Sequence, residues 1–88
     1  FNLKITKSDA LKYLKNCSEQ FNIIFFDPPY IFKNEEYFKI IDLIFERNLL
    51  NSDGLIIAEH SKQISLKKHK NFNKNKDYGG CSFSFFIK

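Results

Sequence analysis

The sequence predicts an α/β domain in which a parallel βαβ unit is followed by an antiparallel terminal hairpin. Three observations support this prediction. Residues 21–26 form a short run of β-branched and aromatic side chains without helical periodicity, which is typical of a strand buried on both faces. A second apolar run spans residues 55–59, and apolar residues recur at helical spacing between the two runs. Near the end, a Gly-Gly pair separates two strand-like segments.

Composition indicates one small domain with a packed core. The chain has 88 residues, of which 43% are hydrophobic, and it includes 11 phenylalanines. Such content argues for a folded core rather than disorder. No apolar stretch is long enough to span a membrane and no leader peptide is recognisable, so we expect a soluble, cytoplasmic protein. Cys17 and Cys81 lie far apart without metal-ligand spacing, so we expect ordinary thiols and no metal site.

The first segment predicts a strand followed by a short helix. The chain begins without a methionine, and Leu3 and Ile5 alternate with polar residues as they would in the middle of a strand. We therefore expect the chain to be a fragment of a longer protein. Ser8 can act as an N-cap and Asp9 favours the first turn, so a helix is predicted over residues 10–14.

The next strand, Phe21–Phe26, ends abruptly in the sequence Asp27-Pro28-Pro29-Tyr30. Proline supplies no N–H to a strand ladder and fixes its own φ angle, so the chain must leave the sheet in a rigid turn. That turn projects Asp27 and Tyr30 from the carboxyl end of a strand, where open α/β sheets bind their ligands. The simpler interpretation is that the two prolines only terminate the strand.

These residue types suit the exocyclic amine of a nucleobase. Asp27 can accept one amine N–H and the carbonyl of Pro28 can accept the other, which holds the nitrogen in place. Tyr30 can stack on the base, an interaction that is worth roughly 1–3 kcal/mol and does not depend on base identity. A base within a helix would first have to leave its stack.

A helix and a second buried strand are predicted after this motif. Asn34 is the expected N-cap, and Glu35 and Glu36 would lie at the positive end of the helix dipole. Apolar residues then recur at helical spacing, namely Phe38, Ile41, Ile44, Phe45 and Leu49. Residues 51–54 predict a turn and Leu55–Glu59 predicts a strand. Strand, helix and strand at this spacing predict a right-handed parallel crossover.

Polar and basic residues follow this second strand. Glu59, His60 and Ser61 would lie at the same sheet edge as Asp27, where they could serve in acid–base chemistry or only satisfy loop backbone. The stretch from residue 62 to 76 contains no Asp or Glu. Its basic residues and histidine are Lys62, Lys67, Lys68, His69, Lys70, Lys74 and Lys76. A charge run is by default a solvated face, but the net charge of +4 is compatible with a polyanionic partner. Beside a base-binding motif, this segment is the best candidate for phosphate contacts.

The end of the chain predicts an antiparallel hairpin. Phe72–Tyr78 would form one arm and Gly79-Gly80 the turn. In the other arm the apolar residues Cys81, Phe83, Phe85 and Ile87 alternate with Ser82, Ser84 and Lys88.

The motif Asp27-Pro28-Pro29-Tyr30 resembles the (D/N)PP(Y/F) motif of amino-group methyltransferases that use S-adenosylmethionine. The flanking segments narrow this resemblance to the RsmD-type 16S rRNA (guanine-N2)-methyltransferase family. These segments are residues 21–30, 55–61, 78–80 and 83–86. The resemblance covers essentially the whole chain but only the C-terminal half of such an enzyme. It implies that residues 1–88 form a partial domain, the C-terminal part of a Rossmann-like class I methyltransferase sheet.

The resemblance also implies an activity and its residues. The reaction would be methylation of the exocyclic N2 amine of a guanine in small-subunit rRNA, with S-adenosylmethionine as the methyl donor. Asp27, Pro28, Pro29 and Tyr30 would be catalytic, and the lysines that would bind RNA are Lys62, Lys67, Lys68, Lys70 and Lys74. Asp9 and Ala10, together with Asp27, would contact the cofactor, although Asp9 could equally serve only to start its helix. The expected partner is small-subunit rRNA or a ribosomal particle.

The same family binds its cofactor mainly through a Gly-rich loop and a later acid. The three glycines of this chain, at positions 54, 79 and 80, are not in that context. We therefore expect this chain alone to hold S-adenosylmethionine poorly and to be inactive, and we expect the edge of the strand 21–26 to lack its neighbour in the family's sheet.

Two alternatives remain open. One is a fragment of a DNA adenine-N6 or cytosine-N4 methyltransferase, which shares the four-residue motif. The other is a non-catalytic module that binds RNA through its lysines.

Overall fold

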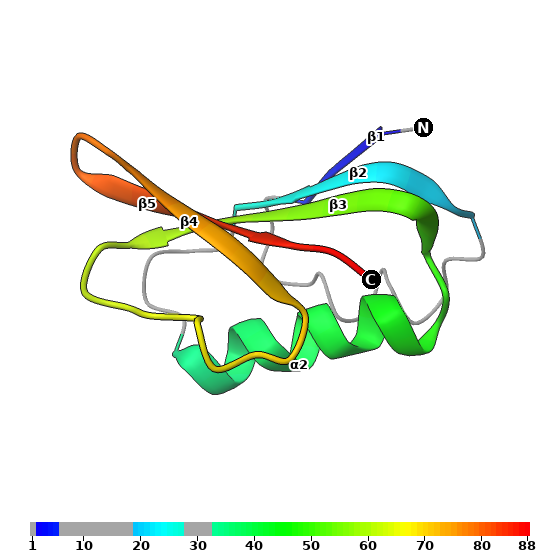
Figure 1. Ribbon diagram of the computed structural model, residues 1–88, viewed down its shortest axis with the longest axis horizontal. Helices are drawn as coiled ribbons and strands as arrows, with labels where there is room; N and C mark the ends of the chain where they lie inside the picture. Colours follow the sequence, from blue (N-terminus) through cyan, green and yellow to red (C-terminus); the bar gives the residue numbers. More distant parts are fainter. Residues whose placement is uncertain (1, 6–18, 28–32) are drawn as a thin grey trace.

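Five strands in the order β1-β2-β3-β5-β4 form one sheet, and helix α2 packs on one of its faces (Figure 1). The structure is a computed structural model that describes residues 2–5, 19–27 and 33–88. The elements are β1 (Asn2–Ile5), β2 (Phe21–Phe26), α2 (Asn34–Glu46), β3 (Leu50–Ser61), β4 (Phe72–Tyr78) and β5 (Cys81–Phe86).

The strand directions confirm the predicted fold class. β1, β2 and β3 are parallel, and α2 connects β2 to β3. β5 runs antiparallel to both β3 and β4, which makes β4 and β5 the predicted terminal hairpin. The chain is thus a mixed α/β sheet of the Rossmann-like kind. The helix predicted over residues 10–14 lies outside the described residues.

The edge of β2 is not open. Asn2 pairs with Ile23 and Ile5 pairs with Phe26 in a parallel ladder. We expected this edge to lack a neighbour, and that prediction is wrong, because the first segment of the chain takes the place beside β2. Among the described residues, the outermost strands of the sheet are β1 and β4.

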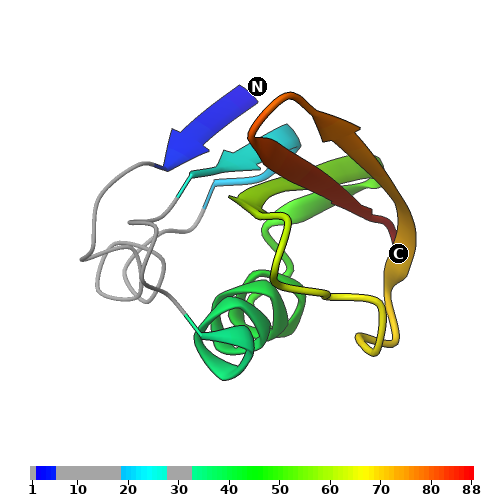
Figure 2. The same ribbon diagram turned by 90° about the vertical axis from the view of Figure 1, so that its left-hand side faces the viewer.

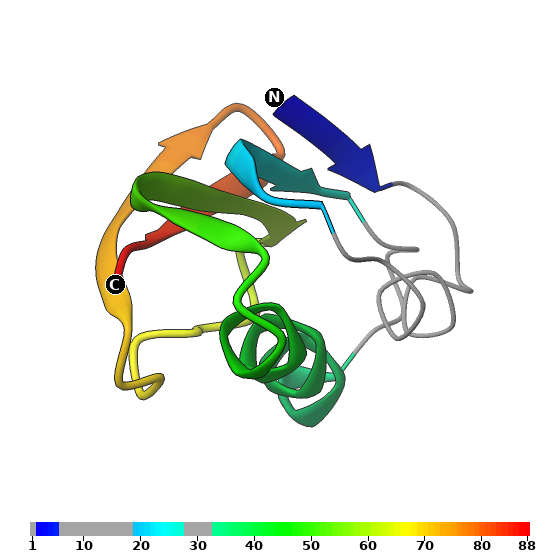
Figure 3. The ribbon, with the colours of Figure 1, turned by 90° about the vertical axis from the view of Figure 1, so that its right-hand side faces the viewer.

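Helix α2 contributes an apolar stripe to the core. Tyr37, Ile40, Ile41 and Ile44 are buried on it. They belong to one core cluster with sheet residues whose side chains alternate to the same face, namely Ile24, Phe26, Ile56, Ala58 and Phe86. Figures 2 and 3 show α2 and the segment of residues 62–71 on this side of the sheet, and no described element lies on the other side.

The ends of α2 differ from the prediction by small shifts. Lys33, rather than Asn34, occupies the N-cap position, and its N–H donates to Glu36 Oε1 at 3.0 Å. Asn34 instead donates through Nδ2 to the backbone oxygen of Ser65 at 3.1 Å, so its side chain anchors the loop after β3. Asn48, with a φ of 55°, ends the helical segment in the left-handed conformation that asparagine tolerates. Leu49 lies beyond the helix but is buried.

The turn predicted at residues 51–54 is wrong, because these residues belong to β3. Phe21 pairs with Leu50 and Ile23 pairs with Leu55, so one residue of β2 lies opposite four residues of β3. The extra residues form an irregular bulge within the strand instead of a separate turn. The Asn-Ser-Asp-Gly sequence therefore signals a break in the ladder, not a break between elements.

The first arm and the turn of the terminal hairpin are as predicted, but the second arm ends at Phe86, so Ile87 and Lys88 lie beyond β5. The turn contains Gly79, whose φ of 53° lies in the left-handed region that glycine adopts without strain. In β5 the two serines, Ser82 and Ser84, face the α2 side and are buried. No helix in the described part of the chain is long and apolar enough to cross a membrane.

Candidate functional site

Two acids lie side by side where β2 and β3 approach their carboxyl ends. The two strands pair in parallel up to Phe26 and Ala58, so Asp27 and Glu59 are the next residues along each. Ala58 is buried on the α2 side, so Glu59 points to the opposite face, because side chains alternate along a strand. Both acids are half-buried. The structure therefore brings them to one edge, as the parallel pairing predicted.

An aromatic and a basic residue of the terminal hairpin lie beside the two acids on the neighbouring strands. Glu59 lies opposite Phe83 of β5, and Phe83 lies opposite Lys76 of β4. We call Asp27, Glu59, Phe83 and Lys76 the carboxyl-edge row. It places two carboxylates, an aromatic ring and an ammonium group on neighbouring strands.

Aromatic rings form the surface next to the carboxyl-edge row. Phe83 stacks on Phe25 with centroids 6.2 Å apart, and Tyr78 meets Phe83 edge-on at 5.5 Å. Tyr78 is 56% exposed, so it offers a ring to a ligand at the edge. An apolar, aromatic surface flanked by acceptors is suited to a planar base.

Tyr37 supports the two acids from the helix side of the sheet. Its hydroxyl donates to the backbone oxygen of Glu59 at 3.1 Å, and its ring contacts Phe26 and His60. Burial, with further contributions from the carboxylates of Asp27 and Glu59, raises the pKa of Tyr37 to about 12. Tyr37 is therefore a neutral donor at ordinary pH and fixes the end of β3.

The thiol of Cys81 lies near Glu59 and donates to the Tyr78 backbone oxygen at 3.6 Å. Burial raises the pKa of Cys81 above its ordinary value, and the charge of Glu59 acts in the same direction. The nearby charge of Lys62 lowers this pKa. A neutral thiol is a weak donor, so Glu59 keeps most of its capacity to accept hydrogen bonds.

His60 points away from Asp27 and Glu59 and has a structural role. It is 4% exposed, and its Nδ1 donates to the Ser61 carbonyl at 2.8 Å, which leaves Nε2 to accept from the Ser84 hydroxyl at 2.7 Å. Asn75 Nδ2 in turn donates to Ser84 and Ser82, and Ser82 donates to Asp77 at 2.6 Å. This network joins β3, β5 and β4. Of the three residues considered for acid–base chemistry, Glu59 and Ser61 alternate to the face of Asp27 and His60 does not. The Ser61 hydroxyl accepts the Gln63 N–H at 3.1 Å.

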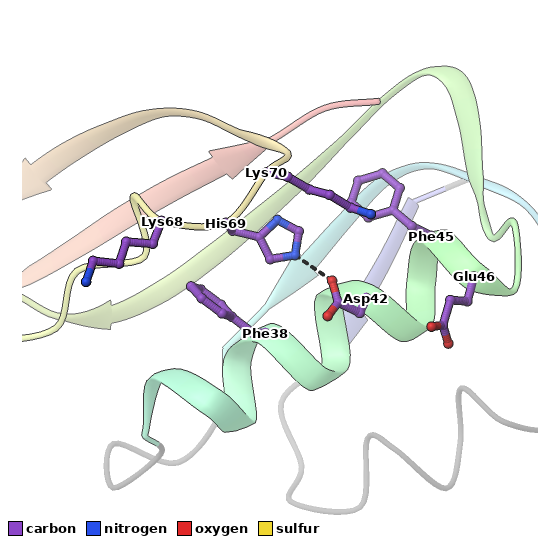
Figure 4. A pocket seen from close by; sticks show the side chains of 7 residues that line it. All are labelled: Phe38, Asp42, Phe45, Glu46, Lys68, His69 and Lys70. Carbon is purple, nitrogen blue, oxygen red and sulfur yellow. Dashed lines mark hydrogen bonds and ion pairs between the residues drawn. The ribbon is translucent and has the colours of Figure 1, made fainter.

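The basic residues after β3 do not form one patch. Lys68 and Lys70 line a pocket of about 380 Å³ beside Phe38 and Phe45 of α2 (Figure 4). In that pocket the Nε2–H of His69 donates to Asp42 at 2.7 Å, because Nδ1 already accepts from the Asn71 N–H. This contact ties the segment to the helix.

The other lysines lie elsewhere. Lys62 and Lys67 line a smaller pocket of about 210 Å³ that also contains Asp77. Lys74 lies over the Phe85 ring, with Nζ 5.3 Å from its centroid, on the face of the carboxyl-edge row. Lys74 and Lys76 are therefore best placed for a nucleic acid that reaches Asp27. Lys68 and Lys70 face the helix side, and the pocket of Lys62 and Lys67 includes the buried serines of that side.

Several predicted residues lie outside the described part of the chain. They are Pro28, Pro29 and Tyr30 of the motif and the expected cofactor residues Asp9 and Ala10. Of the cofactor set, the structure thus places only Asp27. The described glycines lie in the β3 bulge and in the hairpin turn, and none of them leads from a parallel strand into a helix N-terminus.

Sequence reasoning missed four residues of this site, namely Tyr37, Phe83, Tyr78 and Cys81. The predicted apolar stripe of the helix did not include Tyr37, which the structure shows to be buried. The register of the hairpin against β3 brings Phe83 beside Glu59, and no local signal in the sequence fixes that register. No group of three or more His, Cys, Asp or Glu side chains suited to a metal occurs within the described residues.

Comparison with known proteins places the chain in a family. The family model described as Conserved hypothetical protein 95 matches residues 2–87. A protein of Bacillus subtilis (strain 168), named "Putative rRNA methyltransferase YlbH", is 33% identical over 66 residues. That match covers 72% of this chain and 35% of the relative.

Solved structures agree with this assignment. A crystal structure from Haemophilus influenzae, described as a "putative methylase", superposes with a TM-score of 0.68 at 30% identity, covering 90% of this chain and 52% of the other. A conserved hypothetical protein of Streptococcus pyogenes reaches a TM-score of 0.74 at 24% identity, covering 88% of this chain and 49% of the other, and shows the shared fold. The chain thus spans about half of the solved proteins or less. It belongs to the Conserved hypothetical protein 95 family, the RsmD-type methyltransferase family that the motif at Asp27 indicated.

Proposed function

We propose that this chain is the base-binding part of an S-adenosylmethionine-dependent methyltransferase that modifies the N2 amine of a guanine in small-subunit rRNA. The observation that carries the proposal is the position of Asp27 at the carboxyl end of β2, beside Glu59 and near an aromatic surface that includes the exposed Tyr78. The name of the B. subtilis relative supports rRNA as the substrate class. The guanine amine follows from the RsmD-type motif.

In this proposal the residues of the chain orient the amine. Asp27 accepts one amine N–H and the carbonyl of Pro28 accepts the other, which directs the nitrogen lone pair out of the base plane. Tyr30 stacks on the base, and Tyr78 and Phe83 provide apolar surface beside it. The amine becomes acidic only when it has been methylated, so the carboxylate of Asp27 suffices as the proton acceptor and no strong base is needed.

The cofactor supplies the electrophilic methyl group, and Asp27 is the described residue that would lie beside it. Asp9 and Ala10 belong to the same proposal as further contacts. We also propose that residues 1–88 form part of a larger domain, whose Gly-rich loop would hold most of the cofactor. A cytoplasmic location follows from an rRNA substrate.

The lysines are proposed to bind RNA backbone. Lys76 belongs to the carboxyl-edge row and Lys74 lies on the same face. The contact would extend toward α2 through Lys62, Lys67, Lys68 and Lys70. Each phosphate contact releases counterions, so binding should weaken as salt rises.

The test is methyl transfer by the intact protein that carries this chain. We expect transfer of a labelled methyl group from S-adenosylmethionine to a small-subunit particle or its rRNA, and none to duplex DNA. Transfer to duplex DNA would instead support the alternative that the chain is part of a DNA adenine-N6 or cytosine-N4 methyltransferase. Salt-dependent RNA binding without cofactor binding or transfer would support the non-catalytic module.

A further inference from the structure

Glu59, the second acid of the carboxyl-edge row, has no part in the methyl transfer as proposed so far. Glu59 lies one strand away from Asp27, and neighbouring strands are about 4.8 Å apart. Both acids are half-buried and thus open to a ligand at this edge. A donor next to the amine held by Asp27 would therefore lie within reach of Glu59.

The protein holds Glu59 in place without using up its carboxylate. The Tyr37 hydroxyl fixes its backbone oxygen at 3.1 Å, and its ladder partner on β5 is Phe83. The nearby Cys81 thiol donates to the Tyr78 backbone oxygen at 3.6 Å, so it does not occupy the Glu59 carboxylate. This is the arrangement of a preorganised acceptor.

Three common bases carry an exocyclic amine, and guanine differs from adenine and cytosine in the ring nitrogen beside that amine. In guanine the neighbouring N1 carries a hydrogen and is a donor. In adenine the neighbouring N1, and in cytosine the neighbouring N3, carries a lone pair and is an acceptor. A carboxylate facing this position attracts guanine and repels the other two bases.

We infer that Glu59 selects guanine by accepting a hydrogen bond from N1–H while Asp27 holds the adjacent N2 amine. The inference rests on the proposed function and deepens it, because it names the residue that distinguishes the base. Asp27 and Glu59 then have different tasks. Asp27 orients the reacting nitrogen, and Glu59 reads the identity of the ring.

The test compares two RNA substrates for the intact protein, one with guanine and one with 2-aminopurine at the target position. 2-Aminopurine keeps the C2 amine, but its N1 is an acceptor. We expect the native protein to prefer guanine by roughly 100-fold or more in kcat/KM, because a site built for a donor rejects an analogue that lacks it. In Glu59→Gln the amide can donate to N1 of 2-aminopurine. We expect this preference to fall to within roughly tenfold, through a slower guanine reaction and a faster 2-aminopurine reaction.

Glu19→Gln is the matched control, since Glu19 is exposed just before the amino end of β2, and it should leave the preference unchanged. Far-ultraviolet circular dichroism of each variant establishes that it is folded. If Glu59→Gln retains the native preference while the native protein methylates guanine, the inference is wrong and the proposed function stands. If the native protein methylates neither substrate, the proposed function is overturned, and the inference with it.

Discussion

Tyr37 connects the hydrophobic core to the candidate site through a single hydroxyl. It is 1% exposed, yet its oxygen reaches the backbone of Glu59 at the sheet edge. The predicted apolar stripe of this helix did not include Tyr37. Its second task depends on the depth at which α2 packs under β3, which a periodic pattern does not specify.

Stability at high pH should depend on Tyr37. Its pKa is raised to about 12 in the folded protein, against about 10 in the unfolded chain. The folded state thus holds the Tyr37 proton more tightly than the unfolded chain does. The resulting contribution to the free energy of unfolding is complete below pH 10 and is lost as the pH rises through 12. The loss amounts to about 2–3 kcal/mol.

The measurement is urea unfolding of the native protein and Tyr37→Phe between pH 8 and pH 12. Near pH 8 we expect Tyr37→Phe to cost about 1 kcal/mol, because the Glu59 carbonyl loses its donor. The difference between the two proteins should shrink above pH 10 and reverse in sign near pH 12, because the loss of about 2–3 kcal/mol exceeds the initial difference of about 1 kcal/mol. A constant difference across this range would contradict the account of Tyr37.

At the scale of elements, the bulge in β3 shows where sequence reasoning reached its limit. Asn51-Ser52-Asp53-Gly54 has the composition of a turn, and the chain does depart from a regular ladder there. Composition could not show that the strand continues through the irregularity, because that depends on pairing with β2. In contrast, the apolar run of β2 and the Gly-Gly hairpin carry local signals, and the structure confirms both.

Gly54 is required by close packing within this bulge. A Cβ at this position would lie 2.6 Å from Leu50 Cδ1 and 2.9 Å from the Asn51 backbone oxygen. We expect Gly54→Ala to destabilise the protein by about 1–3 kcal/mol through overpacking. Gly80→Ala is the control, since a Cβ there meets nothing within 4 Å. Thermal unfolding followed by circular dichroism compares the two, and equal midpoints would show that the bulge tolerates a side chain.

The contact between His69 and Asp42 joins the basic segment to α2. The His69 side chain is 3% exposed, so loss of its acceptor would leave a buried Nε2–H without a partner. We expect Asp42→Ala to cost about 1–2 kcal/mol and to increase amide hydrogen exchange in residues 62–71. Glu46→Ala, on the same helix and in the same pocket, should change neither quantity by a comparable amount. Similar effects of both variants would point to helix charge instead of this contact.

At the scale of the whole molecule, the sheet has two faces with different uses. The α2 side carries the core and the polar network from His60 to Asp77, which sets the register of three strands. The other side presents the carboxyl-edge row. The sequence alone indicated the fold class, the acid at the end of β2 and the family. It could not indicate the row itself, because the row arises from four strands that meet only in the folded sheet.

The measurement that tests the central claim most directly is the identity of the modified nucleoside. The intact protein and its Asp27→Ala variant are incubated with S-adenosylmethionine and small-subunit particles, and the rRNA is digested to nucleosides for mass spectrometry. We predict N2-methylguanosine with the native protein and a loss of roughly 100-fold or more with Asp27→Ala, because the amine then lacks the acceptor that orients it. Methylation of adenosine or cytidine instead, or N2-methylguanosine formed equally by Asp27→Ala, would contradict the account.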